Sequence, residues 1–206
     1  MKLNTKLFDL TKWNTEMNPL ERLSLKLFNK SKAGYGAIKL TVEVSVVDKV
    51  SGERSQVKKK VCDVGTVQFM NLIAANVFAS AQTSVCKDTG ATATRSVPAN
   101  SACTTIQVVA GTAGTTAAVT DYMLTTQSAS TQGAQTAVIG TVNTSTGVML
   151  ITANMAAPGS TIVYKEIGIY LTANAFIFCV ARDYNGSGWS VDTSHYLAVT
   201  YTLTPS

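Results

Sequence analysis

The stretch VYKEIGIYLTANAFIFCVARD, residues 163–183, decides the fold class of this chain. Its β-branched and aromatic side chains are typical of buried strands, and the Ala-Asn pair at 173–174 interrupts the run near its middle. The pattern therefore predicts two antiparallel strands joined by a short turn. One residue does not suit an apolar hairpin, because Glu166 places a carboxylate in the first strand. This carboxylate has three possible roles: catalysis, metal binding, or holding the scaffold together.

The rest of the second half repeats the pattern of short apolar segments separated by turn residues. These segments are TTIQVVAG (104–111), TAVIGTV (136–142), GVMLITANM (147–155) and HYLAVTYTL (195–203). Before them, TVQFMNLIAANVFASA (66–81) predicts a helix that is apolar on most sides, and such a helix should be covered from several directions. We therefore expect a mainly β (α+β) fold, an antiparallel β-sandwich or barrel packed on one central helix.

A second hairpin is predicted at 37–61. The segment AIKLTVEVSVVD alternates apolar and polar residues, KVSGE turns the chain, and RSQVKKKV returns as the partner strand. One face of the first strand carries Ile38, Leu40, Val42, Val44 and Val46, and the other carries Lys39, Thr41, Glu43 and Ser45. Lysines in the returning strand discourage unwanted pairing at a sheet edge. We expect the returning strand to be an exposed edge strand.

The chain divides into an N-terminal assembly arm, residues 1–36, and a β-rich domain, residues 37–206. In the arm, Asn18-Pro19-Leu20-Glu21 is a helix start, because Asn caps, Pro suits the first turn, and Glu completes a capping box. An apolar stripe follows to about Asn29 and predicts a short helix. Before that helix stand residues too apolar for a solvated tail, which we expect to fill a groove in this subunit or another: Leu3, Leu7, Phe8, Leu10 and Trp13.

The net charge of +5 is unevenly distributed. Residues 1–60 hold 13 of the 17 Lys and Arg residues, but only 6 of the 12 acidic ones. The cluster Lys58, Lys59 and Lys60 is a possible basic contact surface for nucleic acid or an acidic partner. The alternative is an ordinary solvated face. No aromatic residues interleave with these lysines to stack bases, which argues against a single-strand stacking platform. A contact between the lysines and the phosphates of a packaged genome is left as an alternative.

Residues suited to catalysis are few. His195 is the only histidine, and Ser194 directly before it should point to the opposite face of a strand, so we expect no Ser-His pair. The glycines of AGTAGTT (110–116) are followed by no lysine, unlike a phosphate-binding loop. Glu166 and Asp183 form a conceivable carboxylate pair for glycoside cleavage, but acidic residues are scarce after residue 60. We expect no enzymatic activity, no catalytic residues and no cofactor.

The four cysteines lack the spacing of metal ligands, so no metal site is expected. Cys86 and Cys103 flank a polar segment and leave two alternatives open, a disulfide or two thiols. The first residues lack the apolar core of a signal peptide, and no apolar run is long enough to span a bilayer. We therefore expect no membrane partner.

The segment DYNGSGW, Asp183 to Trp189, is the candidate recognition loop, because glycines make it flexible and Tyr184, Asn185 and Trp189 offer contacts. The alternative is a hairpin turn whose aromatic residues cover the end of the sheet. A receptor- or glycan-binding module using this loop is one alternative function for the chain.

Four motifs occur in a fixed order over residues 40–203. They are VVDKVSGERSQVKKKVCDVGTVQFMNLIAANVF, IQVVAGTAGTTAAVTDYML, YKEIGIYL with FIFCVARD, and YLAVTYTL. This order resembles that of virion structural proteins of tailed phages and related viruses, in which a hairpin leads to a helix, a Gly-Thr loop ends in D-x-x-L, and EIG precedes a hairpin with a terminal Arg. Two departures are Ala113 in the Gly-Thr loop and the polar insertion at 84–105.

The resemblance implies a non-enzymatic structural subunit of the tail, neck or capsid surface, made in the host cytoplasm and located in the virion. Its partners would be copies of itself and other virion proteins, and a capsid decoration protein is an alternative. In that setting Glu166 fixes strand register, with Lys165, Arg182 or a backbone turn as its partner. We take Glu166 and Arg182 as the expected structural pair.

Overall fold

The computed structural model describes residues 38–77, 82–87, 92–95, 104–118, 120–127, 134–173 and 176–205. The predicted arm and its short helix lie outside these residues. The same holds for the five apolar arm residues, Leu3, Leu7, Phe8, Leu10 and Trp13, and for Cys103, so the Cys86–Cys103 alternatives stay predictions.

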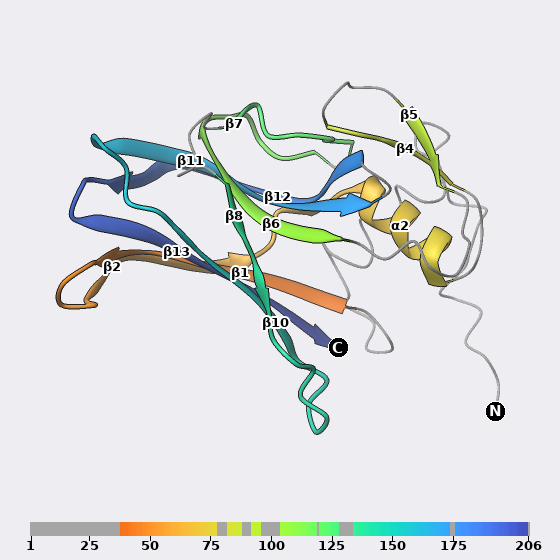
Figure 1. Cartoon of the computed structure of the whole chain (residues 1–206), viewed down its shortest axis with the longest axis horizontal. Coiled ribbons are helices and arrows are strands. Elements are labelled where there is room, and N and C mark those ends of the chain that lie inside the picture. Colours follow the sequence, from red (N-terminus) through yellow and green to blue (C-terminus); the bar gives the residue numbers. More distant parts are fainter. Residues whose placement is uncertain are drawn as a thin grey trace.

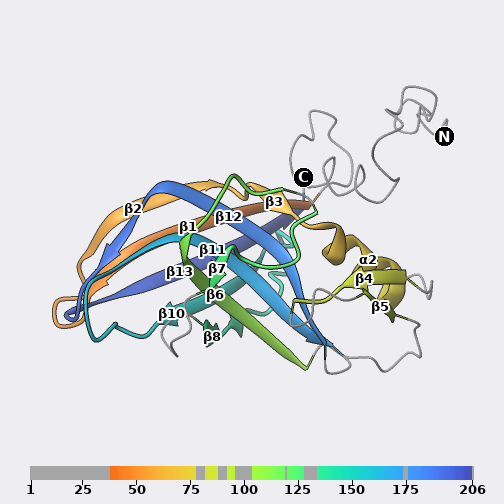
Figure 2. The same cartoon turned by 90° about the horizontal axis from the view of Figure 1, so that it is seen from above.

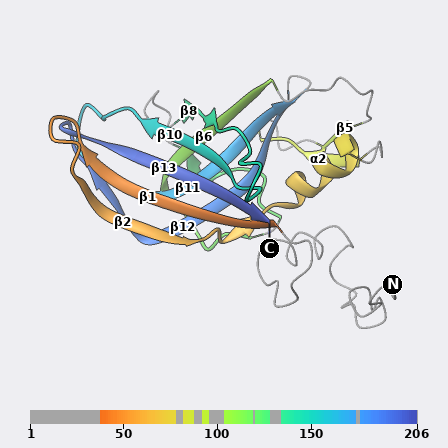
Figure 3. The ribbon, with the colours of Figure 1, turned by 90° about the horizontal axis from the view of Figure 1, so that it is seen from below.

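The described chain is mainly β, as predicted, and its two large sheets are antiparallel throughout (Figure 1). The five-stranded sheet has the order β2-β1-β13-β10-β9, and Figure 3 shows β2, β1, β13 and β10 side by side. Its strands are β1 (Ile38–Asp48), β2 (Arg54–Val61), β9 (Val138–Ile139), β10 (Met149–Met155) and β13 (His195–Pro205). The hairpin predicted at 37–61 is confirmed as β1 and β2, and β2 is an exposed edge strand.

The six-stranded sheet has the order β3-β12-β11-β6-β7, with β8 also paired to β6. Its strands are β3 (Val64–Gly65), β6 (Thr105–Ala113), β7 (Thr126–Gln127), β8 (Ala134–Thr136), β11 (Ile162–Ala173) and β12 (Phe176–Val191). The hairpin predicted at 163–183 is confirmed as β11 and β12, closing at Ala173 opposite Phe176. A separate two-stranded sheet pairs β4 (Gln82–Val85) with β5 (Thr92–Arg95) at the start of the polar insertion.

The buried faces of the two large sheets share one hydrophobic core. On β1 the predicted alternation holds for Leu40, Val42, Val44 and Val46, which are all buried, whereas Ser45 on the opposite face is buried too. Facing β1 and β13, the other sheet contributes fully buried residues of β11 and β12. They include Tyr164, Ile167, Phe178 and Trp189. Because apolar surface is covered from both sides, this layered core is the main stabilising feature of the described fold.

The helix α2 (Val67–Val77) begins where predicted but is not central. It lies at one end of the sheets, against β12 and the β4–β5 pair (Figures 1 and 2). Met70 and Leu72 are buried in the common core, and Thr66 fixes the helix start because its hydroxyl donates to the Cys179 carbonyl of β12. The prediction of a central helix is wrong because the sheets cover each other's apolar faces and leave only an end for α2.

Candidate functional site

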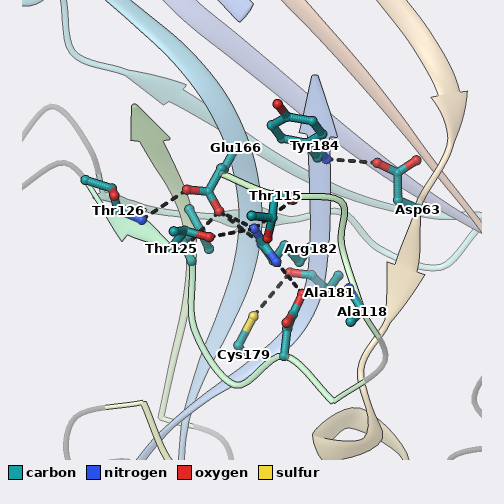
Figure 4. Close-up of polar contacts among 12 residues, drawn as sticks. Asp63, Thr115, Ala118, Thr125, Thr126, Glu166, Cys179, Ala181, Arg182 and Tyr184 are labelled. Carbon is teal, nitrogen blue, oxygen red and sulfur yellow. Dashed lines mark hydrogen bonds and ion pairs between the residues drawn. The ribbon is translucent and has the colours of Figure 1, made fainter. Parts of the chain in front are cut away.

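Glu166 is completely buried in β11 and accepts four hydrogen bonds (Figure 4). Its Oε2 accepts from Arg182 Nε at 3.0 Å, from Arg182 Nη2 at 2.8 Å and from the Thr125 N–H at 2.9 Å. Its Oε1 accepts from the Thr126 N–H at 3.1 Å. The Glu166–Arg182 pair is therefore present, and the same carboxylate also holds two backbone groups of a neighbouring loop.

Arg182, on β12, uses its remaining donors on that loop. Its Nη1 donates to the Asp121 carboxylate, and its Nη2 donates to the Thr115 carbonyl at 3.0 Å and to the Thr125 hydroxyl at 2.8 Å. Burial by itself would lower the pKa of Arg182, but the hydrogen bonds to Asp121 and Glu166 outweigh that effect and raise it. The guanidinium therefore stays charged and joins two strands to one loop.

We call residues 114–118 and 120–125 the anchored loop, since one further hydrogen bond also holds it on the sheet. The Tyr170 hydroxyl accepts the buried Leu124 N–H at 2.8 Å. Two glycines leave room for Glu166, because a Cβ at Gly111 would lie 2.9 Å from its Oε1 and a Cβ at Gly114 only 2.6 Å from its Cγ. The EIG and Gly-Thr motifs, far apart in sequence, are thus halves of one structural unit.

A second buried carboxylate, Asp183, follows Arg182 on β12 and ties the two sheets together. Its Oδ1 accepts the Asp63 N–H at 2.7 Å, and its Oδ2 accepts the Tyr201 hydroxyl at 2.9 Å and the Cys62 thiol at 3.1 Å. Desolvation raises the pKa of Asp183, although the hydrogen bond from Asp63 and the nearby Lys60 ammonium act against it. Asp183 is thus committed to internal donors.

The predicted basic surface divides into three different environments. Lys60 donates to the Asp63 carboxylate and to the Tyr184 carbonyl at 2.9 Å, and Asp63 accepts the Tyr184 N–H at 2.8 Å. Lys59 is exposed, with its Nζ 3.7 Å from a Glu43 oxygen. Lys58 Nζ donates to the side chains of Asn185 and Ser187 in β12. The three lysines therefore do not form one uniform cationic surface.

The interpretation of Asp183 to Trp189 as a flexible recognition loop is wrong, because these residues lie within β12. Trp189 is 1% exposed and pairs with Tyr164 across the hairpin. The glycines mark a bulge, since the β11–β12 register shifts here and Gly188 has a φ of +71°. Such a bulge looks like a turn in sequence, whereas in the fold it bends a continuous strand.

The structure also brings the predicted basic surface on β2 into contact with the predicted recognition segment on β12. Lys58 Nζ donates to Asn185 Oδ1 at 2.8 Å and to Ser187 Oγ at 2.6 Å. Beyond them, the Gln56 amide exchanges two 3.0 Å hydrogen bonds with the Ser190 backbone. Side chains of the edge strand β2 thus clasp β12 of the other sheet.

The expectation that Ser194 points away from His195 on a strand is also wrong, because Ser194 lies in a turn and its Oγ is 3.1 Å from His195 Nδ1. The same Nδ1 lies 2.6 Å from Asp192 Oδ1, to which Ser194 Oγ also donates. A Ser-His-Asp relay needs serine and aspartate on opposite ring nitrogens. Here Ser194 and Asp192 both lie at Nδ1, and Asp48 Oδ2 is 3.8 Å from Nε2, which is too far for a hydrogen bond. This cluster therefore closes a turn and does not form such a relay.

Sequence reasoning missed four contributors to these clusters: Asp63, Asp121, Tyr170 and the role of Asp183. The D-x-x-L end of the Gly-Thr motif was the available signal for Asp121, since that aspartate is the one acid of the segment. Nothing in local spacing linked these residues, because their partners are 16 to 121 residues away.

Within the described ranges, no group of three or more His, Cys, Asp or Glu side chains is placed to hold a metal ion. No helix in that part of the chain is long and apolar enough to cross a membrane. Comparisons with known proteins add no relative: no family model matches the sequence, and no curated protein or solved structure matches it.

Proposed function

We propose that this chain is a non-enzymatic structural protein of a virus particle, assembled in several copies in the tail, neck or capsid surface, where it could also serve as a decoration protein. It is made in the host cytoplasm and located in the virion, and its partners are copies of itself and other virion proteins. In the finer architecture of this proposal, the two sheets form a β-sandwich with α2 at one end. Residues 1–36 form an arm with a short helix that grips a neighbour.

The observation that carries the proposal is a set of exposed apolar side chains at and beside β9, the edge strand of the five-stranded sheet. Four large apolar side chains are exposed there: Val138 (69%), Ile139 (46%), Val142 (49%) and Leu150 (41%). Among the described residues, the short strand β9 pairs only with β10 and ends the sheet. An apolar edge of this kind is typical of a surface that another protein covers.

The polar interior supports the same proposal. The hydrogen-bond partners of three buried charged residues are backbone and side-chain groups of this same chain; the three are Glu166, Arg182 and Asp183. Such fully used buried networks fix the relative positions of strands and loops. A subunit that must present the same surface in every copy gains from this rigidity.

The sandwich is joined along both of its sides. On one side, side chains of β2 clasp β12 through Gln56 and Lys58. On the other, the segment 134–139 pairs first with β6 of one sheet and then with β10 of the other. The two sheets of the proposed sandwich are thus linked along both sides, while the outer edge of β9 pairs with no further strand among the described residues.

The proposal is tested by protein mass spectrometry of virus particles purified from cells that produce the virus encoding this sequence. The full chain should be found in the particles in multiple copies. A chain without residues 2–30 should fold, as judged by circular dichroism, and be missing from the particles. If the full chain is abundant in the lysate and absent from the particles, the structural role is refuted. If the truncated chain enters particles equally, only the role of the arm is refuted.

A further inference from the structure

A small cavity lies where β2 clasps β12. It has a volume of about 80 Å³ and is lined by Val42, Val44, Lys58, Lys60, Tyr184, Asn185 and Trp189. The hydrogen bonds from Gln56 to Ser190 and from Lys60 to Tyr184 hold the strands together at either side. The walls of the cavity are therefore held in place by direct contacts between the two sheets.

Two N–H donors of the cavity-lining residues have no acceptor among the described residues, Nδ2 of Asn185 and Nε1 of Trp189. The amide of Asn185 is oriented by its own Oδ1, which accepts from Lys58 and from Ser187 at 2.9 Å. Trp189 is 1% exposed, and an indole N–H can only donate. Buried donors are nearly always satisfied, so this cavity calls for an acceptor.

The charges around the cavity favour an anion with a single charge. Lys60 is already paired with Asp63 and lies 3.7 Å from Asp183, so little of its charge is left for a ligand. Lys58 pairs with no carboxylate in the described part of the chain. One uncompensated ammonium beside two unsatisfied donors matches a monoanion, whereas a dianion would be repelled by the two nearby carboxylates.

We propose that this cavity binds one carboxylate group, with Lys58, Asn185 and Trp189 as its donors. Val42 and Val44 provide apolar wall for the attached methyl or methylene group, and the volume suits a group of acetate size. The group arrives either as a free small carboxylic acid or as an Asp or Glu side chain of a neighbouring polypeptide. The proposal does not depend on the chain being a virion protein.

The test uses Trp189 as the reporter. The chain has two tryptophans, so Trp13→Phe in the full chain leaves Trp189 as the only indole. Sodium acetate is titrated against sodium chloride at constant ionic strength while the Trp189 emission is followed. Acetate should change the emission in a saturable way at millimolar concentration, and chloride should not. An acetate response that is missing, or equal to that of chloride, overturns the proposal.

A matched pair of variants locates the site. Lys58→Gln removes the one lining lysine that pairs with no carboxylate among the described residues, and it should weaken acetate binding at least about tenfold, because a charge-assisted hydrogen bond is lost. Lys59→Gln removes the next lysine, which lies against Glu43 and does not line the cavity, and should leave binding unchanged. Both variants should match the parent in circular dichroism and stay folded at the assay temperature, although Lys58→Gln also loses the hydrogen bonds to Asn185 and Ser187. Equal acetate affinity in both variants overturns the assignment of Lys58.

Peptides distinguish the two sources of the carboxylate. The blocked tripeptide Gly-Glu-Gly is compared with Gly-Gln-Gly and with acetate in the same assay. Binding of the Glu peptide about tenfold tighter than acetate, with none of the Gln peptide, identifies a protein side chain as the natural occupant. Similar affinities for acetate and the Glu peptide identify a site for the carboxylate group alone. Equal binding of the Glu and Gln peptides contradicts carboxylate recognition.

Discussion

Replacing Glu166 by Gln probes the centre of the anchored-loop network with almost no change in side-chain volume. The carboxylate accepts four N–H groups, from Arg182, Thr125 and Thr126. A glutamine side chain has one acceptor oxygen and one NH₂ group. If the oxygen stays on Arg182, the NH₂ group faces the Thr126 N–H, so that at least one buried donor is left opposite another donor.

The loss of unfolding free energy in Glu166→Gln depends on which partners Arg182 keeps. Breaking a buried ion pair by removing one partner costs about 3–5 kcal/mol, because the other charge stays buried. Here Arg182 keeps a second carboxylate, Asp121, so we expect the lower end, about 3 kcal/mol. For a chain of 206 residues, each kcal/mol lowers the melting temperature by about 2–4 °C, which gives a decrease of about 6–12 °C.

The assay is thermal unfolding followed by circular dichroism, with Glu43→Gln as the matched control. Glu43 is also a strand glutamate beside cations, but its partners Arg54 and Lys59 are exposed, so the control should lose less than about 1 kcal/mol. Hydrogen exchange should accelerate at the Thr125 and Thr126 amides in Glu166→Gln alone. Equal melting temperatures for the two variants, with unchanged exchange at these amides, would refute the reasoning.

Three further variants test separate parts of the account. Burial raises the pKa of Asp183 in the folded chain, so its contribution to stability is fully present below the unfolded pKa of about 3.9 and is lost as pH rises through the folded pKa. Urea unfolding from pH 4 to 7 should show this loss of unfolding free energy in the wild type and not in Asp183→Asn. Parallel curves of unfolding free energy against pH for the two proteins would contradict this. Gly114→Ala places a Cβ 2.6 Å from Glu166 and should cost about 1–3 kcal/mol in the same urea assay, whereas Gly159→Ala, with nothing within 4 Å, should cost almost nothing; equal costs would rule out the close approach. Tyr170→Phe leaves a buried backbone N–H without its acceptor and should lower the unfolding free energy by about 1–3 kcal/mol, so an unchanged value would show that the anchored loop does not need this hydroxyl.

The elements that the sequence predicted correctly are those with a clear local periodicity of apolar and polar residues. The alternation in 37–48 predicted β1 and its buried face, and the lysines of 54–61 predicted an exposed edge strand. The β-branched and aromatic run at 163–183 predicted the β11–β12 hairpin. In each case neighbouring residues carry the signal, because a strand's faces follow directly from a period of two.

The parts that it missed depend on contacts between distant residues. The length and apolarity of α2 predicted a covered helix, but only the packing of the two sheets decides that it lies at one end. Gly186 and Gly188 look like a turn, although the register against β11 makes them part of a bulged strand. The partners of Arg182 and Asp183 come from other elements, and no spacing in the sequence brings them together.

The most direct test of multi-copy assembly is sedimentation velocity of the purified full chain over a wide concentration range. We expect species larger than the 21.7 kDa monomer, in a fraction that rises with concentration. Replacing both Val138 and Ile139 of the exposed β9 edge by Thr should shift the distribution back toward the monomer. A single 21.7 kDa species at every concentration would contradict the account.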